Sequence, residues 1–427
     1  MYESRQPFQK KKRTSSSQAK GVVQRAVGFE VEVKNWRTWK PRDDQSFFEG
    51  LLRRGISYRK PHNARDVLMK SKGYELTADR PSSESVPEFV TDAFQETDDG
   101  EQKLQRTFQS IVELVDHMHQ DAQKHPNSLN DLRHYEYAGD LRKPFTMIDA
   151  ENVPDLHPQA TVGVHLTKMS NLMEISGNHS PSQKAHSRFT RIADVHDPPA
   201  YQEKDSMTSA FPKALKALES FKKKHISEPN WEPSEELKNL FAYMIHYLEC
   251  PMVNFQSYPK SYFPIMARTD FAMTFKLMPP EEVFMFSEND GELFVKLFEH
   301  VNFSPPCGTK MEMHQQVFQK GIRQGQPTAS CHEINGLNRA AWVRNIALGR
   351  DMMTQDDYPG KRNQGRQFET MGAWYKYDRL GDWRIPAPVL ELRRIQFTRD
   401  IKELPLIAHD VFNTIRELNK EPSQWIR

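Results

Sequence analysis

The sequence predicts an α+β fold, because a few strand-like runs are scattered among many helical segments. Five runs show the alternation of apolar and polar side chains, or the content of β-branched residues, that is typical of strands. These runs cover residues 26–34, 74–79, 87–91, 159–166 and 388–397. The chain has no internal repeat, and its 427 residues are enough for one large domain with insertions.

The helical segments are predicted from apolar residues that recur at steps of three and four. In the longest segment, residues 100–124, this spacing joins Leu104, Phe108 and Ile111. Further helices are expected at 167–175, 212–225, 234–249, 290–301, 342–348 and 403–419. A passage rich in Ser, Pro, His and Asp interrupts the helices at residues 176–212 and predicts a surface insertion or a lid.

Charged residues stand inside the first and the last predicted strand. Successive side chains of a strand point to opposite faces, so Glu30 and Glu32 share one face while Phe29 points to the other. Two like charges side by side repel each other unless water, a cation or a basic group lies over them. Of these candidates, a divalent metal ion gives the most specific hypothesis about function. In the last strand, Glu391 and Arg393 share a face in the same way.

The charge of the chain is unevenly distributed. Residues 1–25 contain seven basic residues and one acidic residue, a net charge of +6, which leaves −4 for the rest of a chain whose total is +2. The segment has no apolar periodicity, so we expect a disordered basic leader that is either solvated or used for docking or nuclear import. A slightly acidic body argues against a dedicated nucleic-acid-binding protein.

The composition also limits the cellular compartments in which the protein is expected. The sequence contains no apolar run of the roughly 18 residues that a membrane-spanning helix needs, and no secretory segment follows Met1. Cys250, Cys307 and Cys331 are too few and too scattered for a disulfide framework or a zinc site built from cysteine pairs. We therefore expect a soluble protein of a reducing compartment, cytoplasmic in the cell that makes it.

Four motifs occur in an informative order. They are Gly-Phe-Glu-Val-Glu at 28–32, Thr-Ala-Asp at 77–79 leading to Pro-Glu-Phe-Val-Thr at 87–91, Gln-Ala-Thr-Val-Gly-Val-His at 159–165, and Pro-Val-Leu-Glu-Leu-Arg-Arg at 388–394. In this order they resemble the carboxylate-amine ligases of the glutamine synthetase fold, in particular the amidoligase branch. The resemblance spans roughly residues 26–400. It implies one catalytic domain over residues 26–427, with a curved antiparallel sheet of the glutamine synthetase type and helices packed on one side.

The resemblance also implies the roles of particular residues. Glu30, Glu32, Glu88 and Glu391 would be metal ligands, with Asp79 as a helper. Glu88, His165 and Arg393 would be catalytic, and Arg268, Arg393 and Arg394 would contact ATP. The family often has two histidines one residue apart on the strand that matches residues 159–165, whereas here Gly163 and Val164 precede His165 and Leu166 follows it. That departure concerns the part of the family's site that bears on metal geometry and on recognition of the amine.

The reaction that the resemblance implies is the joining of a carboxylate to an amine through an acyl phosphate made from ATP, with Mg²⁺ or Mn²⁺. Carboxylate oxygens suit a hard cation, and arginine can bind phosphate oxygens in pairs. His165 or a carboxylate would remove the proton of the amine. The carboxylate and amine substrates are left open, a protein target among them.

A second similarity concerns the N-terminal part of the body. The run Val-Val-Gln-Arg-Ala-Val-Gly-Phe-Glu at residues 22–30, after a low-complexity leader, resembles the start of toxin domains carried by bacterial contractile injection systems. It implies an effector that is delivered into a target cell, with the leader contacting the delivery apparatus.

Two other functions remain open at this stage. Glu32-Val33-Lys34 matches the Glu-x-Lys half of the core of restriction-endonuclease-type, metal-dependent nucleases, but residues 1–29 supply only Glu3 as the acidic partner that the other half needs. The second alternative is a catalytically degenerate ligase fold that serves as a binding module.

Overall fold

A computed structural model describes most of the predicted body of the chain. The described residues are 26–39, 62, 66–79, 85–124, 130–131, 139–142, 146–177, 200–249, 265–269, 271–303, 333–334, 337–349, 387–393 and 395–420. The predicted leader, Arg394, the three cysteines and the toxin-like residues 22–25 lie outside these ranges. So do residues 178–199 of the predicted insertion.

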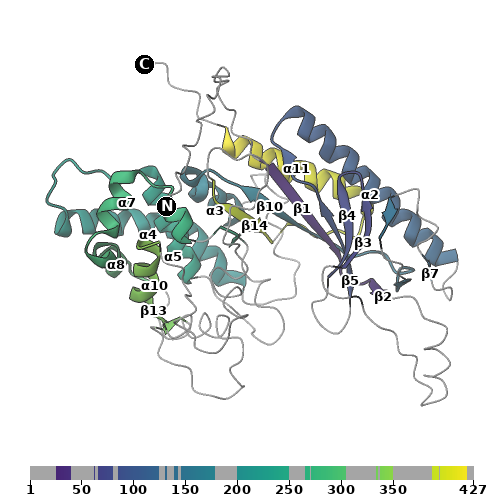
Figure 1. Ribbon diagram of the computed structural model, residues 1–427, viewed down its shortest axis with the longest axis horizontal. Coiled ribbons are helices and arrows are strands. Elements are labelled where there is room, and N and C mark those ends of the chain that lie inside the picture. Colours follow the sequence, from purple (N-terminus) through teal and green to yellow (C-terminus); the bar gives the residue numbers. More distant parts are fainter. Residues whose placement is uncertain are drawn as a thin grey trace, which may run out of the picture.

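The structure is of mixed α and β type and contains one nine-stranded antiparallel sheet (Figure 1). From one edge to the other, its strands are β11 (Ile265–Ala267), β14 (Val389–Leu392), β10 (Leu156–Gly163), β1 (Ala26–Val33), β5 (Val86–Thr91), β4 (Tyr74–Asp79), β3 (Asp66–Ser71) and β8 (Asp140–Leu141), and β6 (Phe94–Gln95) also pairs with β1. Strands from near both ends of the chain, β1 and β14, are thus separated in the sheet by the single strand β10.

Two smaller sheets complete the strands of the described ranges. One joins β2 (Arg37–Trp39), β9 (Thr146–Ile148) and β7 (Asn130–Asp131), and the other joins β12 (Glu333–Ile334) to β13 (Leu337–Asn338).

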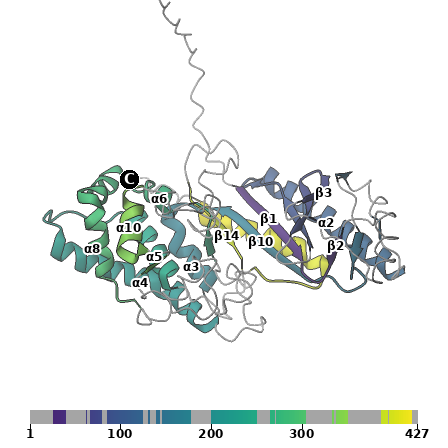
Figure 2. The same cartoon turned by 60° about the horizontal axis from the view of Figure 1, so that its bottom comes forward.

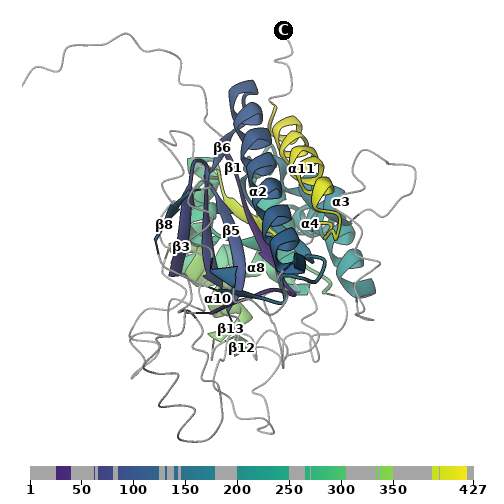
Figure 3. The ribbon, with the colours of Figure 1, turned by 90° about the vertical axis from the view of Figure 1, so that its right-hand side faces the viewer.

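One face of the main sheet packs against two helices, α2 (Asp98–Lys124) and α11 (Leu404–Asn419), which lie side by side in Figure 3. The alternation of β1 sends Phe29, Val31 and Val33 into this layer, where all three are buried. The ring of Phe29 meets that of Phe108 on α2 edge to face, with centroids 5.1 Å apart. Burial of such apolar side chains is the main stabilising contribution to the layer.

The hairpin from β3 to β4 is shaped by a glycine. Gly73 has φ +95°, a conformation that residues with a Cβ adopt at a cost, and an added Cβ would lie 2.5 Å from the hydroxyl of Thr107 on α2. Gly73 therefore allows both the tight turn and the close approach of the helix.

Apart from the 3₁₀ turn η8 (Ile401–Glu403), which precedes α11, the remaining helices of the described ranges form a lobe beside the β14 end of the sheet (Figures 1 and 2). They are the 3₁₀ turns η2 (Leu166–Lys168) and η6 (Asn289–Gly291) and the helices α3 (Met169–Gly177), α4 (Ala200–His225), α5 (Glu235–Glu249), α6 (Phe271–Phe275), α7 (Pro280–Ser287), α8 (Glu292–Glu299) and α10 (Arg339–Ala347). Aromatic pairs such as Phe241 with Phe298, 4.8 Å between centroids, fill the lobe. One continuous cluster of buried apolar residues includes both the lobe and the sheet.

The segment 398–419 is fixed to both ends of β10. At one end, Thr398 and Leu156 exchange backbone hydrogen bonds of 2.9 and 3.0 Å. At the other end, the buried amide of Asn419 donates to the carbonyl of Gly163 at 2.8 Å and accepts from the backbone N–H of His165 at 3.1 Å. Helix α11 is thereby held along the whole length of the strand behind the polar face of the sheet.

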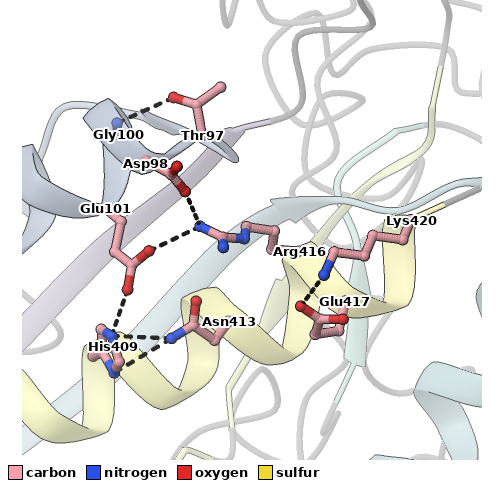
Figure 4. Close-up of polar contacts among 9 residues, drawn as sticks. All are labelled: Thr97, Asp98, Gly100, Glu101, His409, Asn413, Arg416, Glu417 and Lys420. Carbon is pink, nitrogen blue, oxygen red and sulfur yellow. Dashed lines mark hydrogen bonds and ion pairs between the residues drawn. The ribbon is translucent and has the colours of Figure 1, made fainter.

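A polar clasp joins α11 to the first turn of α2 (Figure 4). Glu101 contacts His409 at 2.7 Å and accepts from Arg416 at 2.8 Å, and Arg416 also reaches Asp98 at 3.2 Å. Although burial alone would raise the pKa of Glu101, the hydrogen bond with His409 and the positive charge of Arg416 lower it overall.

Several sequence predictions of elements are confirmed, with shifts at their ends. The strand at 26–34, the hairpin of 74–79 with 87–91, the helix at 100–124 and the final helix at 403–419 are all present. The expected start of a helix at residue 212 is wrong, because α4 already begins at Ala200 and contains Pro212. The segment before the proline is rich in helix formers and buries Met207 and Ala210, which supports the helix upstream of it. None of the described helices is long and apolar enough to cross a membrane.

Candidate functional site

The candidate site is the polar face of the main sheet, opposite α2 and α11. Strand register brings its side chains together, since residues paired across an antiparallel ladder point to the same side. Glu32 on β1 lies opposite Glu88 on β5 and opposite His157 on β10. Glu30 lies opposite Gln159 on β10. Three strands from separate parts of the sequence thus contribute side chains to a single surface.

Three carboxylates form the acidic part of this face, which we call the carboxylate cluster. Glu32, Asp79 and Glu88 come from β1, β4 and β5, and each offers an oxygen atom within 4.8 Å of the others. Thr77 donates a hydrogen bond to Glu88 at 3.2 Å. Lys34 forms an ion pair with Glu32. The hairpin of β4 and β5 therefore positions two of the three carboxylates.

The cluster is electrostatically crowded. Burial raises the pKa of Glu88 to about 8, and the negative charges of Glu30, Asp79 and Glu32 act in the same direction, while the hydrogen bond from Thr77 opposes them. A carboxyl with such a pKa is largely protonated at pH 7 unless a cation lies beside it. The site therefore favours the arrival of positive charge.

The basic part of the polar face lies two strands beyond β1. Glu391 on β14 is fully buried and is flanked by two guanidinium groups, at 2.7 Å from Arg393 and in an ion pair with Arg268. We call Arg268 and Arg393 the arginine pair. Each arginine side chain is 15% exposed, so the pair is reachable from the polar face without being fully solvated.

Backbone contacts fix the position of Arg268 just after β11. Its N–H donates to the carbonyl of Val389 at 2.8 Å, and the buried hydroxyl of Thr269 accepts from the N–H of Val389 at 2.8 Å. Arg268, one of the arginines expected to contact ATP, is thus attached to the strand that carries Arg393, β14.

Glu30 lies between the two parts. Burial raises its pKa, Glu391 and Glu32 raise it further, and Arg268 and Arg393 lower it. Glu30 is not among the three carboxylates that share the cluster. Its position couples the acidic and the basic part of the face.

His165 is placed differently from the expectation. Strand β10 ends at Gly163, and His165 precedes η2 with its Nδ1 at 2.7 Å from the hydroxyl of Thr167. Six residues of extended chain separate it from Gln159, on the order of 20 Å along the strand. A histidine on this strand does face the cluster, but it is His157.

His157 is the site residue that sequence reasoning missed. It pairs with Asp155 at 3.3 Å and stacks on Phe397 with 5.3 Å between centroids. Burial lowers its pKa, although Asp155 opposes this, so the neutral imidazole is the main form at pH 7. The sequence does contain a sign of this position, because His157 and Gln159 are two residues apart and would share one face of a strand. Pro158 argued against extending the predicted strand to His157, since prolines are uncommon inside central strands.

The donor set of the site fits a hard divalent cation and a phosphate group. Three carboxylates within 4.8 Å offer only oxygen ligands, which suit Mg²⁺ or Mn²⁺ better than softer metals. The arginine pair offers planar forks of N–H donors, which suit phosphate oxygens. Glu32 and Glu88 of the predicted metal ligands fall in the first group, and Arg268 and Arg393 of the predicted nucleotide contacts in the second.

Comparisons with known proteins give two partial similarities. No protein-family model and no curated protein matches the chain. A solved structure of a Vibrio cholerae toxin from the MARTX/VgrG family has a TM-score of 0.38 and 12% identity, over 88% of this chain and 94% of that chain. A mutant of the ACD domain of a VgrG Vibrio cholerae toxin, in complex with ADP and Mn²⁺, has a TM-score of 0.35 and 12% identity, over 88% and 95%. TM-scores this low decide neither fold nor function, so the proposal below rests on the residues of the site.

Proposed function

We propose that this chain is a carboxylate-amine ligase that uses ATP and Mg²⁺ or Mn²⁺, with a sheet of the glutamine synthetase type. One observation carries the proposal. A single polar sheet face bears a carboxylate cluster on β1, β4 and β5 and an arginine pair at β11 and β14, with β10 between them. Such a face can hold a cation at one side and phosphate oxygens at the other.

The separation suits a nucleotide phosphate chain. From β5 to β14 there are three strand spacings of about 4.8 Å, or roughly 14 Å between the strand axes. Side chains from both strands reach inward over β1 and β10. The space above Gln159 and Glu30 is therefore where a phosphoryl group would be shared by the two parts.

In the proposed reaction, an oxygen of the substrate carboxylate attacks the γ-phosphorus of ATP, the bond from that phosphorus to the β–γ bridging oxygen breaks, and ADP leaves. The amine nitrogen then attacks the acyl carbon, the carbon–oxygen bond to phosphate breaks, and the nitrogen loses a proton. Arg268 and Arg393 would stabilise charge on the transferred phosphoryl oxygens. A cation held by Glu32, Asp79 and Glu88 would neutralise charge on the nucleotide phosphates.

The proton of the amine needs an acceptor near this face. His157 faces the cluster from β10 and is neutral at pH 7, so it can accept a proton, and Asp155 can then stabilise the imidazolium. We assign the role of base to His157 in place of His165, whose side chain contacts Thr167 beyond the strand end.

We further propose that the ligase acts as a bacterial effector or toxin. The support is the basic segment 1–25 and the toxin-like run that ends at Glu30. Delivery into a target cell would bring the enzyme to its carboxylate and amine substrates, and a protein target fits that setting.

The test is calorimetric titration of ADP or ATP in the presence and absence of Mg²⁺. We expect the wild type to bind the nucleotide in a metal-dependent way. Because Glu88→Gln removes a ligand of the cluster, we expect its affinity for the metal, and with it the metal-dependent part of nucleotide binding, to be at least roughly tenfold weaker. Glu75→Gln is the matched control. Glu75 lies on β4, where it pairs with Lys70 at 2.6 Å, about 13 Å along the strand from Asp79. A wild type that binds no nucleotide with Mg²⁺ or Mn²⁺ would refute the proposal.

The nuclease is the second candidate, because Glu32 and Lys34 share a strand face and Glu88 supplies the acidic partner from β5. It leaves the arginine pair without a role. Cleavage of plasmid DNA with Mn²⁺, lost in Glu32→Gln, would favour it. A protein that binds a partner but neither nucleotide nor metal would instead be a degenerate ligase fold used as a binding module.

A further inference from the structure

Glu391 stands apart from the other carboxylates of the polar face. It is fully buried on β14, whereas the side chains of the carboxylate cluster are only partly buried. Its Oε2 atom forms the ion pair with Arg268, and its Oε1 atom forms the ion pair with Arg393. Burying a carboxylate is costly unless opposite charges accompany it, so the two guanidinium groups account for its presence there.

The net charge around Glu391 disfavours the binding of a cation there. Together with the arginine pair, it forms a group of net charge +1, which attracts anions and repels a second positive ion. The carboxylate cluster carries three formal negative charges against the single ion pair with Lys34. A divalent ion therefore gains more from the cluster than from the vicinity of Glu391.

Geometry leads to the same assignment. Two oxygens on one Mg²⁺ lie at most about 4.2 Å apart, because each bond is about 2.1 Å long. Glu391 and Glu88 are on strands separated by roughly 14 Å, with β10 and β1 between them. In the described part of the chain, the group of three carboxylates near this limit is Glu32, Asp79 and Glu88, whose oxygens lie within 4.8 Å of one another.

Resting on the function proposed above, we infer that Glu391 is a positioning residue that holds Arg268 and Arg393 in place to receive a phosphate group, and that it does not bind the metal ion. Without its charge, the two guanidinium groups repel each other and lose their common anchor. On the other side of β14, Thr161 of β10 is paired in register with Glu391.

The experiment compares Glu391→Gln with Glu32→Gln in two titrations. The first uses Mn²⁺ alone, detected by electron paramagnetic resonance. The second uses ADP, and separately pyrophosphate, at saturating Mn²⁺. For Glu391→Gln we expect Mn²⁺ affinity within about threefold of the wild type and the same number of bound ions, with roughly tenfold weaker ADP and pyrophosphate binding. For Glu32→Gln we expect the loss in the Mn²⁺ titration.

Two results would overturn the inference. Weaker Mn²⁺ binding by Glu391→Gln, of the size seen with Glu32→Gln, or one bound ion fewer, would make Glu391 a metal ligand. Equal or tighter anion binding by Glu391→Gln would mean that Glu391 only opposes the charge of the phosphate. If Glu391→Gln does not fold, Glu391→Asp is used in its place, because aspartate keeps the negative charge on a side chain that is one methylene shorter. Its anion binding should weaken while Mn²⁺ binding stays unchanged.

The outcomes also separate this inference from the proposed function. A wild type that binds pyrophosphate but not ADP would refute the ligase while leaving the role of Glu391 to be judged by its variants. A wild type that binds ADP with Mn²⁺, together with a variant that loses Mn²⁺, would support the ligase and refute the positioning role. Absence of any anion binding by the wild type would refute both.

Discussion

The raised pKa of Glu88 makes a quantitative prediction about stability. In the unfolded chain a glutamate loses its proton near pH 4.5, whereas folded Glu88 keeps it up to about pH 8. Between these values the folded state binds more protons, so the free energy of unfolding falls as the pH rises. Below pH 4.5 both states are protonated, and above pH 8 the loss is complete.

The size of the effect follows from the same two values. At about 1.4 kcal/mol for each tenfold change in proton affinity, the difference between 4.5 and 8 gives about 5 kcal/mol as an upper value, since neighbouring carboxylates can share the proton. Glu88→Gln removes the ionisable group and keeps an oxygen for the hydrogen bond from Thr77. In a chelator, we expect the variant to be more stable than the wild type at pH 8 and to lose that advantage towards pH 4.5.

The assay is thermal unfolding in EDTA at several pH values between 4.5 and 8.5. The wild type, Glu88→Gln and the control Glu75→Gln are compared at each pH. The difference in Tm between Glu88→Gln and the wild type should grow by several degrees across this range, while Glu75→Gln shows no such growth. A variant that is destabilised at pH 8, or a difference that does not depend on pH, would refute the account of the crowded cluster.

Three further predictions concern the metal ion and the attachment of α11. Mn²⁺ at about a hundred times the Kd of the wild type should stabilise the wild type by about 2.7 kcal/mol in thermal unfolding at pH 8, and should stabilise Glu88→Gln by no more than about 1.4 kcal/mol, since its affinity for the ion is at least roughly tenfold lower. The lowered pKa of Glu101 means that its clasp with His409 stabilises the fold above pH 4.5 and is lost as the pH falls through the lowered value. Glu101→Gln should therefore lower the Tm at pH 7 and have a shrinking effect as the pH falls below 4.5, and an equal effect at both pH values would contradict this. Asn419→Ala should cost about 1–3 kcal/mol in urea unfolding, because it leaves the carbonyl of Gly163 without its donor, and a neutral variant would show that water replaces the amide.

The parts of the site that the sequence predicts well depend on local alternation. Glu30 and Glu32 lie on one face of β1 because Phe29 and Val31 must be buried on the other, a pattern visible in eight residues. The hairpin of β4 and β5 is predicted for the same reason, and it brings Asp79 and Glu88 together.

Other parts depend on contacts that no local pattern encodes. Strand β3 was missed because a register shift between Val67 and Met69 breaks its alternation, so that Leu68 and Met69 are both buried. The pairing of Arg268 with Glu391 depends on β11 joining β14, which is a matter of tertiary structure. His165 was favoured by a motif, whereas the register of β10 assigns the position beside Glu32 to His157.

The arrangement of the sheet has a consequence for the order in which the site is completed. The carboxylate cluster is assembled from residues 32–88, but the arginine pair requires β14, which lies between β10 and β11 in the sheet and is followed in sequence by α11. The contacts that fix α11 join residues far apart in the sequence, at a separation of 308 positions for His409 and Glu101 and 256 positions for Asn419 and Gly163. Contacts of such long range form late, because the closure of a long loop precedes any gain from them. In the proposed function, a growing or refolding chain would therefore be able to bind a cation well before it could bind a phosphate group. It would remain inactive as an enzyme until α11 has packed against the sheet.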